Sequence, residues 1–325
     1  MDMPNPHAVT GEILAWLEGH GFPGQVQPLP GDVSPRRYFH VQGEVGPGSA
    51  TAILAVYPPE VRSSCQRFLR SGELLTGVGV RVPEVLAVDC GRGWMLIEDL
   101  GPRTLADCAA LPWNELATCF LDAIELGRRI AGLPERLLCD LNPPLDRALL
   151  HRELTQTWEL FLEPRGLTGE VGLAEVLEEL CANLAAESPV PCHRDFMARN
   201  LMPLTGGRVA VLDHQDLRLG PPAYDLASLL NDTLFPPPGI EERLLDAALA
   251  SGIDRVGYHR AAAQRTLKAV GTYTAFSRRG SDRHLHLVWP TLKRSLVHLA
   301  RVPESAPLVP ALERLWSSVE GMVLP

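Results

Sequence analysis

One segment constrains the fold of this chain more than any other, and it runs from residue 193 to residue 213. Within it, Asp195 and Asn200 stand close together in sequence, so we expect one tight loop to carry both on its rim. The pair Gly206-Gly207 then predicts a hairpin turn, and the apolar strand that follows ends at Asp213. Because a hairpin folds the chain back on itself, we expect Asp213 to lie beside Asn200.

The polar side chains of this segment have complementary chemistry. Asp195 offers a carboxylate that can accept a proton, while Asn200 and Asp213 offer the oxygen atoms that Mg²⁺ prefers as ligands. Transfer of the γ-phosphoryl group of ATP to a hydroxyl requires both functions. The residues from His193 to Asn200 also fit the kinase catalytic-loop pattern H-R-D-x-x-x-x-N. The alternative is structural, with both aspartates capping turns and Asn200 satisfying the loop backbone.

Two further residues are expected to support this loop. Asp225 begins an amphipathic helix just after Gly220-Pro221-Pro222, so we expect it to cap that helix or to anchor the catalytic loop by hydrogen bonds. His193 is expected to be a buried imidazole that organises the loop and takes no part as an acid or base.

The sequence pattern changes near residue 100. The expected elements before it are helices at 8–20 and 61–76 and strands at 38–41, 50–57, 82–89 and 94–98. After Thr104 the pattern is helical, apart from one β interruption at 201–213. We therefore expect an α+β, bilobal, protein-kinase-like fold. Residues 1–100 would form a small antiparallel-sheet lobe that binds nucleotide, and residues 101–325 a large helical lobe with the catalytic loop and the acceptor site. The crossing at Gly101-Pro102 suggests a hinge above a cleft.

Charge and composition exclude several classes of protein. The 30 Lys+Arg and 39 Asp+Glu residues give a net charge of −9, which argues against a nucleic-acid or anionic-membrane binder. No apolar run approaches the ~18 residues of a membrane span, and the first residues do not resemble a secretory leader. The 7 cysteines, none of them in a C-x-x-C pair, favour a reduced cytoplasmic protein and argue against a zinc site or a disulfide framework.

The chain contains only two lysines, Lys268 and Lys293, so the N-terminal region has none to clamp the phosphates of ATP. Arg36 and Arg37 lie in a turn that leads into a strand, where a guanidinium fork suits phosphate oxygens. Neighbouring side chains on a strand point to opposite faces, so we expect only one of these arginines to face the nucleotide. The alternative is that both are solvated hairpin residues.

Several segments together resemble one superfamily. They are Ser34–Phe39, His193–Asn200, Val211–Asp216 and Gly220–Ala227. These segments are similar to the aminoglycoside phosphotransferase/choline kinase superfamily, and they look closest to its bacterial anomeric kinases of N-acetylmuramate and N-acetylglucosamine. One departure is His214, which stands next to Asp213 where this branch usually has Phe.

The resemblance implies a set of roles. Asp195 would be the general base, Asn200 and Asp213 would bind Mg²⁺, and the backbone from Glu98 to Leu100 would meet the adenine of ATP. The implied reaction is phosphorylation of the C1 hydroxyl of an amino sugar in cell-wall sugar recycling or salvage. The alternatives are a kinase of the same fold that acts on an amino alcohol or an aminoglycoside, and a nucleotide-binding pseudokinase that regulates a partner.

The basic residues of the C-terminal region bear on the acceptor. Residues 255–303 contain ten Lys/Arg and one acid, Asp282, which argues against a polycationic aminoglycoside or choline if this segment lines the cleft. The alternative is that these cations pack against acidic helices elsewhere. The side chains expected to contact the sugar are Asp195, His214, Gln215, Asp216 and Glu153. The sequence leaves the sugar and the oligomeric state open.

Overall fold

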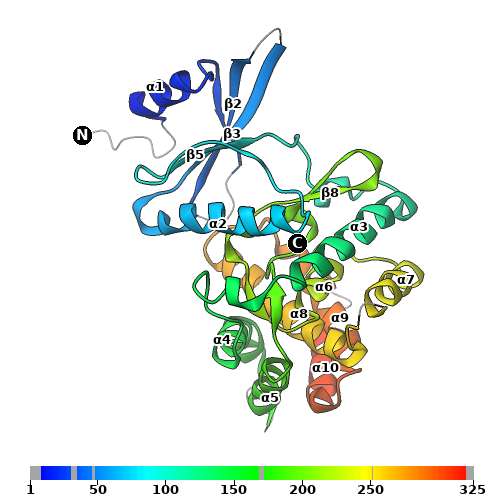
Figure 1. The fold of residues 1–325 in the computed structure, drawn as a ribbon. Coiled ribbons are helices and arrows are strands. Elements are labelled where there is room, and N and C mark those ends of the chain that lie inside the picture. The colour runs from blue at the N-terminus through cyan, green and yellow to red at the C-terminus, as the bar shows by residue number, and fades with distance from the viewer. Residues whose placement is uncertain (1–8, 31–34, 46–47, 168–171, 251, 320–325) are drawn as a thin grey trace. The chain divides into compact units, whose positions relative to one another are not determined.

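The structure is a computed structural model that describes residues 9–30, 35–45, 48–167, 172–250 and 252–319 (Figure 1). The chain divides into two compact units, each described here by itself. The first unit takes residues 1–102 and 210–215, and the second takes residues 103–209 and 216–325. A single boundary at residue 100 therefore does not describe residues 210–215, which return to the first unit.

The first unit is built on a five-stranded antiparallel sheet with the strand order β1-β2-β3-β5-β4 (Figure 1). Its elements are β1 (Val26–Pro28), β2 (Arg37–Val45), β3 (Gly48–Val56), β4 (Val85–Asp89), β5 (Trp94–Glu98), α1 (Gly11–Gly19) and α2 (Ser63–Gly77). Successive side chains of β3 point to opposite faces of the sheet. Leu54 packs in a cluster with Leu17 of α1, whereas Ala55 packs in a cluster with Phe68 of α2. The two helices therefore cover opposite faces.

The first unit also contains a disulfide that the cysteine pattern did not predict. Cys65 of α2 and Cys90, which follows β4, are bonded with their Cα atoms 5.7 Å apart. The two cysteines are 25 residues apart in sequence, so the packing of α2 against the sheet brings them together. The expectation of reduced thiols is wrong for this pair, while Cys108, Cys119, Cys139, Cys181 and Cys192 are free.

The second unit is mainly helical (Figure 1). Its helices are α3 (Trp113–Ala131), α4 (Arg147–Thr157), α5 (Leu173–Ala185), α6 (Tyr224–Leu230), α7 (Pro238–Leu249), α8 (Arg255–Arg278), α9 (Val288–Leu299) and α10 (Leu308–Val319). The longest of these, α8, packs against α4, α6 and α9. Alanines 261, 262 and 263 on α8 are buried, and small side chains of this kind let neighbouring helices approach closely.

Two short ladders frame the loop that the sequence singles out. The strand β6 (Val190–Cys192) pairs with β9 (Arg218–Gly220), and β7 (Leu201–Pro203) pairs with β8 (Val209–Val211). The loop from His193 to Asn200 therefore begins where β6 ends and finishes where β7 begins. Both of its ends are held by backbone hydrogen bonds of a ladder, which limits the conformations that the loop can adopt.

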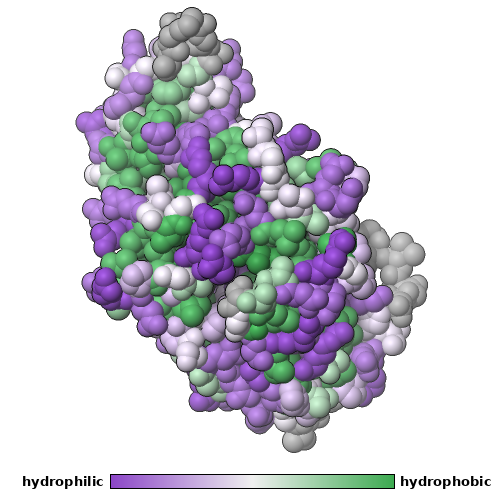
Figure 2. Space-filling model, turned by 45° about the vertical axis from the view of Figure 1, so that its right-hand side comes forward, coloured by the Kyte–Doolittle hydropathy of each residue, from purple (hydrophilic) through white to green (hydrophobic). Residues whose placement is uncertain are grey.

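Figure 2 shows one face of the surface, on which hydrophilic residues are mixed with hydrophobic ones. Exposed large apolar side chains come from different elements, among them Leu14, Leu86 and Leu121. Scattered apolar side chains of this kind are ordinary on protein surfaces. Within the described ranges, no helix combines the length and the apolar character needed to cross a membrane.

The close crossing of α8 and the end of α4 at Gly271 predicts how a substitution there changes the free energy of unfolding. A Cβ added to Gly271 would overlap Thr157 Oγ1 and would lie 2.5 Å from the Thr157 backbone nitrogen. Gly271→Ala must therefore push two buried helices apart, and we expect it to lower the free energy of unfolding by ~1–3 kcal/mol. Urea unfolding followed by circular dichroism measures the change.

The matched control is Gly239→Ala on α7, where an added Cβ meets nothing within 4 Å. We expect this variant to unfold at the wild-type urea concentration or slightly above it, because alanine restricts the unfolded chain. Equal midpoints for Gly271→Ala and Gly239→Ala would show that the helix crossing is not tight.

Candidate active site

The loop from His193 to Asn200 is anchored from below by Asp225. The Asp225 carboxylate accepts hydrogen bonds from the backbone N–H of His193 at 2.6 Å and of Arg194 at 2.9 Å. Arg194 has a φ of 77°, in the left-handed region that a side chain rarely adopts. These two charge-assisted hydrogen bonds fix the peptide groups on both sides of the His193 Cα, and Ser228 Oγ donates to the Arg194 carbonyl oxygen at 3.5 Å, so the backbone is held before and after Arg194. Asp225 thus occupies the anchoring position that the sequence suggested for it.

The other end of the loop is closed by Asn200. Its side-chain NH₂ donates to the backbone carbonyl oxygen of Asp195 at 2.8 Å. The side-chain carbonyl oxygen of Asn200 is thereby oriented away from that bond, which is the oxygen that a metal ion would use. His193 is fully buried and packs edge-on against Phe196, with ring centroids 5.7 Å apart, as expected of a residue that organises the loop.

A network of ion pairs surrounds Asp195 in the second unit. Arg265 of α8 places Nη1 3.4 Å from Asp195 Oδ1, and Arg194 places Nη1 3.7 Å from Asp195 Oδ2. Glu153 of α4 accepts from Arg194 at 3.0 Å and from the Lys268 ammonium group at 2.7 Å. The Asp195 side chain is 27% exposed and that of Glu153 is 8% exposed. Asp195 is therefore the carboxylate that a ligand can reach, and Glu153 supports the cations behind it.

These cations decide the protonation of the two carboxylates. Burial by itself would raise the pKa of the Asp195 carboxyl, but the charges of Lys268, Arg265 and Arg194 outweigh burial and hold that pKa below its ordinary range. In the same way, Lys268 and Arg194 overcome burial and lower the pKa of Glu153 to about 2. Both groups are carboxylates at neutral pH, so Asp195 is available to accept a hydrogen bond from a hydroxyl.

The basic segment 255–303 divides between the two interpretations that the sequence left open. Arg265 and Lys268 reach the network around Asp195. By contrast, Arg260 pairs with Glu187 and Glu304, which agrees with the alternative that the cations of this segment pack against acidic residues elsewhere. The charge pattern of the sequence does not single out Arg265 or Lys268. The scarcity of lysine could have drawn attention to Lys268, because it is the only lysine among the first 292 residues and it pairs with Glu153.

In the first unit, Arg36 reaches Asp213. Arg36 Nη2 donates to Asp213 Oδ1 at 2.7 Å, and the Arg36 side chain is 11% exposed. Burial lowers the pKa of the Arg36 guanidinium, but Tyr38 and Asp213 outweigh this effect and the net shift is upward. Arg37 begins β2 and lies over the Phe39 ring, 5.9 Å from its centroid. The two arginines therefore have different surroundings, and Arg36 is the one beside the expected metal ligand.

Asp213 has the chemistry that Mg²⁺ requires. Its side chain is 36% exposed, and it has a φ of 55°, so Asp213 and Arg194 are the two non-glycine residues of the described ranges with left-handed backbones. Strained backbone of this kind concentrates at functional sites. Oxygen atoms from Asp213 and Asn200 suit a hard cation, so these residues fit Mg²⁺ in donor type.

The structure separates the three residues that follow Asp213. His214 is fully buried, with Nδ1 2.7 Å from Ser71 Oγ of α2 and its ring 4.2 Å from that of Phe68. Gln215 is also buried and donates to Asp213 Oδ1 at 2.9 Å. Both side chains hold the segment around Asp213 in place, and their expected contact with the sugar stays a prediction. The short turn after β8 directs His214 against α2.

Asp216, by contrast, belongs to the second unit and is 31% exposed. It pairs with Arg194 at 2.7 Å and with Arg218 at 3.3 Å, so it joins the network around Asp195. Glu98, at the end of β5, pairs through its side chain with Arg81 at 2.6 Å. Leu100 follows outside the sheet.

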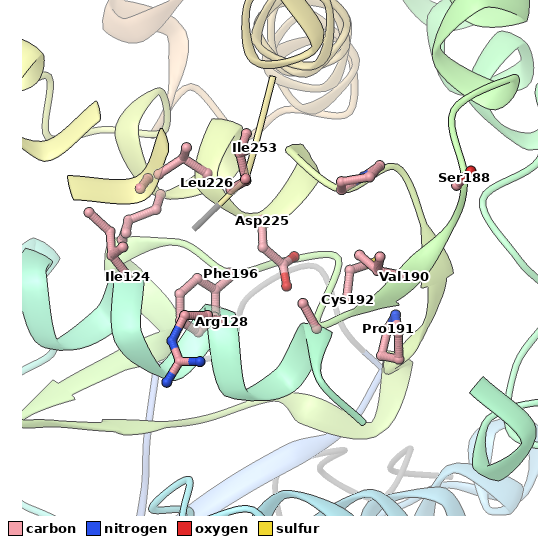
Figure 3. A pocket seen from close by; sticks show the side chains of 16 residues that line it. Ile124, Arg128, Ser188, Val190, Pro191, Cys192, Phe196, Asp225, Leu226 and Ile253 are labelled. Carbon is pink, nitrogen blue, oxygen red and sulfur yellow. The ribbon is translucent and has the colours of Figure 1, made fainter. Parts of the chain in front are cut away.

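A cavity of about 340 Å³ lies against the back of the loop (Figure 3). Most of its lining is apolar, including Ile124, Leu226 and Ile253, and the Asp225 carboxylate points into it. Asp195 is not part of this lining. The cavity therefore lies on the side of the loop where the anchor is, away from the proposed reacting carboxylate.

The ion pairs of Glu153 make its contribution to stability dependent on pH. Its native pKa of about 2 lies below the ordinary value of 4.5, so the stabilisation is present above pH 4.5 and is lost as the pH falls towards 2. We expect Glu153→Gln to lower the free energy of unfolding at pH 7 by on the order of 3 kcal/mol, and the difference from wild type to shrink on acidification. Urea unfolding between pH 2.5 and 7 tests this.

Glu159→Gln is the control, because this glutamate lies close by in sequence but is exposed. Its effect should stay below ~0.5 kcal/mol at every pH. A Glu153→Gln deficit that does not change between pH 7 and pH 2.5 would contradict the proposed ionisation of Glu153.

Comparison with known proteins identifies the family. Residues 25–264 match the family model described as "Phosphotransferase enzyme family". The chain is 32% identical over 320 residues to the N-acetylmuramate/N-acetylglucosamine kinase of Pseudomonas aeruginosa, covering 92% of this chain and 91% of that protein. A protein of the same name from Neisseria meningitidis is 31% identical over 317 residues, covering 89% of this chain and 90% of that one.

Solved structures show the same fold at lower identity. The ADP-bound aminoglycoside phosphotransferase APH(2'')-Ib has a TM-score of 0.60 at 17% identity, covering 91% of this chain and 99% of that chain. The choline kinase LicA from Streptococcus pneumoniae has a TM-score of 0.62 at 15% identity, covering 87% and 97%. These likenesses confirm the α+β, protein-kinase-like fold. The family model matches most of this chain, and the relatives align with it over most of their length. The chain therefore belongs to the phosphotransferase enzyme family.

Proposed function

We propose that this protein uses ATP to phosphorylate the C1 hydroxyl of an amino sugar, N-acetylmuramate or N-acetylglucosamine. The observation that carries the proposal is the environment of Asp195, a partly exposed carboxylate kept ionised by Arg194, Arg265 and Lys268 on an anchored loop. The names of the relatives support the amino sugar. Because the reaction consumes ATP, we place it in the cytoplasm, as a step of sugar recycling or salvage.

In the proposed reaction Asp195 accepts the proton of the sugar hydroxyl. The hydroxyl oxygen forms a bond to the γ-phosphorus of ATP, the bond from that phosphorus to the bridging oxygen breaks, and ADP leaves. The low pKa of Asp195 makes it a weak base, so its main contribution is to orient the hydroxyl while little proton transfer has yet occurred. Asn200 and Asp213 would hold Mg²⁺, which when bound neutralises charge on the phosphates.

The remaining residues have proposed positioning roles. Arg36 would take the place of the absent lysine on the phosphates, because its guanidinium group already lies at Asp213. The backbone from Glu98 to Leu100 would contact adenine. Asp216 would accept a hydrogen bond from a sugar hydroxyl, while Glu153 would act through Arg194 and Lys268 and not touch the sugar.

The first test concerns the base. Asp195→Asn keeps the shape of the side chain but removes the proton acceptor, so kcat should fall roughly 10²–10⁴-fold while ATP affinity changes little. Release of ADP with a panel of sugars, amino alcohols and aminoglycosides measures both the activity and the acceptor. Asp140→Asn, at an exposed position, is the control and should keep wild-type turnover. Near-normal turnover of Asp195→Asn would remove Asp195 from this role.

The second test compares two neighbouring arginines. Arg36→Ala should lower kcat/KM for ATP about 10- to 100-fold, matching ~1.5–3 kcal/mol for a hydrogen bond to a charged group. Arg37→Ala is the matched control and should stay within about twofold of wild type, because its guanidinium group lies over Phe39. If Arg37→Ala is the damaging change, the assignment is reversed. If both variants keep wild-type kinetics, backbone and metal alone hold the phosphates.

A further inference from the structure

The ion-pair network around Asp195 is rich in cations. Its members, connected by ion pairs of no more than 4 Å, are Arg194, Arg218, Arg265, Lys268, Glu153, Asp195 and Asp216. Four cations thus pair with three carboxylates, and the buried Asp225 carboxylate also acts on Arg265. The two cations that α8 contributes stand side by side, and such a pair favours the binding of an anionic group over a cationic one.

Two of the four cations come from α8. Arg265 and Lys268 are three residues apart on this helix, so they share one face with Cβ atoms ~5–6 Å apart. Lys268 is 17% exposed, and within the described ranges its ammonium group makes one hydrogen bond, to Glu153. An ammonium group has three N–H donors, so two of them are available to a ligand.

Lys268 also lies close enough to the reacting carboxylate for one small molecule to touch both. Arg194 connects them, since it contacts Glu153 at 3.0 Å, the partner of Lys268, and Asp195 at 3.7 Å. Among the charges that act on Asp195, that of Lys268 is the largest. A hexose with its hydroxyl at Asp195 therefore has a ring substituent within reach of Lys268.

We propose that Lys268, with Arg265 beside it, forms an anion subsite that binds a carboxylate substituent of the acceptor sugar. The preferred acceptor is then an amino sugar that carries a carboxylate, as N-acetylmuramate does, over the neutral N-acetylglucosamine. The subsite takes no part in the bond exchange; it binds and orients the acceptor. This inference rests on the proposed sugar-kinase function and adds to it a residue that determines specificity.

The test compares acceptors that differ in charge but little in shape. N-acetylmuramate and its neutral methyl ester are offered to the full-length protein, with N-acetylglucosamine as a third acceptor, and kcat/KM is measured for each by release of ADP. We expect the wild type to favour the acid over the ester by about tenfold or more, as for a hydrogen bond between charged groups. Lys268→Met should lower this acid-to-ester ratio about tenfold, and Lys268→Arg should keep most of it.

Lys293→Met is the matched control, because Lys293 is exposed on α9 and lies over the ring of Trp316. It should keep the wild-type acid-to-ester ratio. Circular dichroism of each variant checks folding, and the ratio in the wild type alone tests the subsite even if Lys268→Met does not fold. A wild type that uses acid and ester equally, or a Lys268→Met variant with the wild-type ratio, would overturn the anion subsite.

The same measurements distinguish a wrong subsite from a wrong proposed function. If the wild type phosphorylates N-acetylglucosamine and N-acetylmuramate but does not discriminate acid from ester, the sugar-kinase function holds and the subsite is wrong. If the wild type phosphorylates none of the three acceptors, the proposed function is wrong and the subsite falls with it.

Discussion

The two hydrogen bonds that Asp225 accepts from the backbone of His193 and Arg194 are the interaction on which the candidate site depends. They fix the backbone that leads into Arg194, which has a left-handed conformation. From that conformation the Arg194 side chain reaches Glu153 and Asp216, and the next residue presents its carboxylate to α8. A buried carboxylate that binds only backbone groups therefore sets the direction of the charged side chains above it.

The first unit uses a comparable device at Asp213. This residue also has a left-handed backbone, and its neighbours His214 and Gln215 hold the segment by contacts to Ser71 and to the Asp213 carboxylate. In both units a strained segment that carries an aspartate is stabilised by buried side chains. The strain is thus balanced by local packing and hydrogen bonds.

Much of the fold and of the candidate site could be predicted from the sequence, because the sequence patterns that indicate them are local. The motif around Asp195, the anchor at Asp225 and the change of pattern near residue 100 are all visible as spacing or periodicity. The bond of Cys65 to Cys90 could not be predicted, since it depends on how a helix packs on a sheet. The burial of His214 was missed for the same reason, because a polar residue next to an expected metal ligand looks exposed until α2 is placed against it. Glu153 was named among the side chains that would contact the sugar, and its pairing with Arg194 and Lys268 is visible only in the structure.

The lysine at position 268 has a chemical consequence beyond binding. Burial lowers the pKa of its ammonium group to about 8, with Arg265 adding to the shift, so a substantial fraction is the nucleophilic free amine in mildly alkaline solution. The chain has just one other lysine. Amine-selective acylating reagents therefore have very few side chains to modify in this protein, and the one with the lowered pKa belongs to the network around Asp195. Covalent labelling of Lys268 would report on whether the proposed acceptor site is occupied.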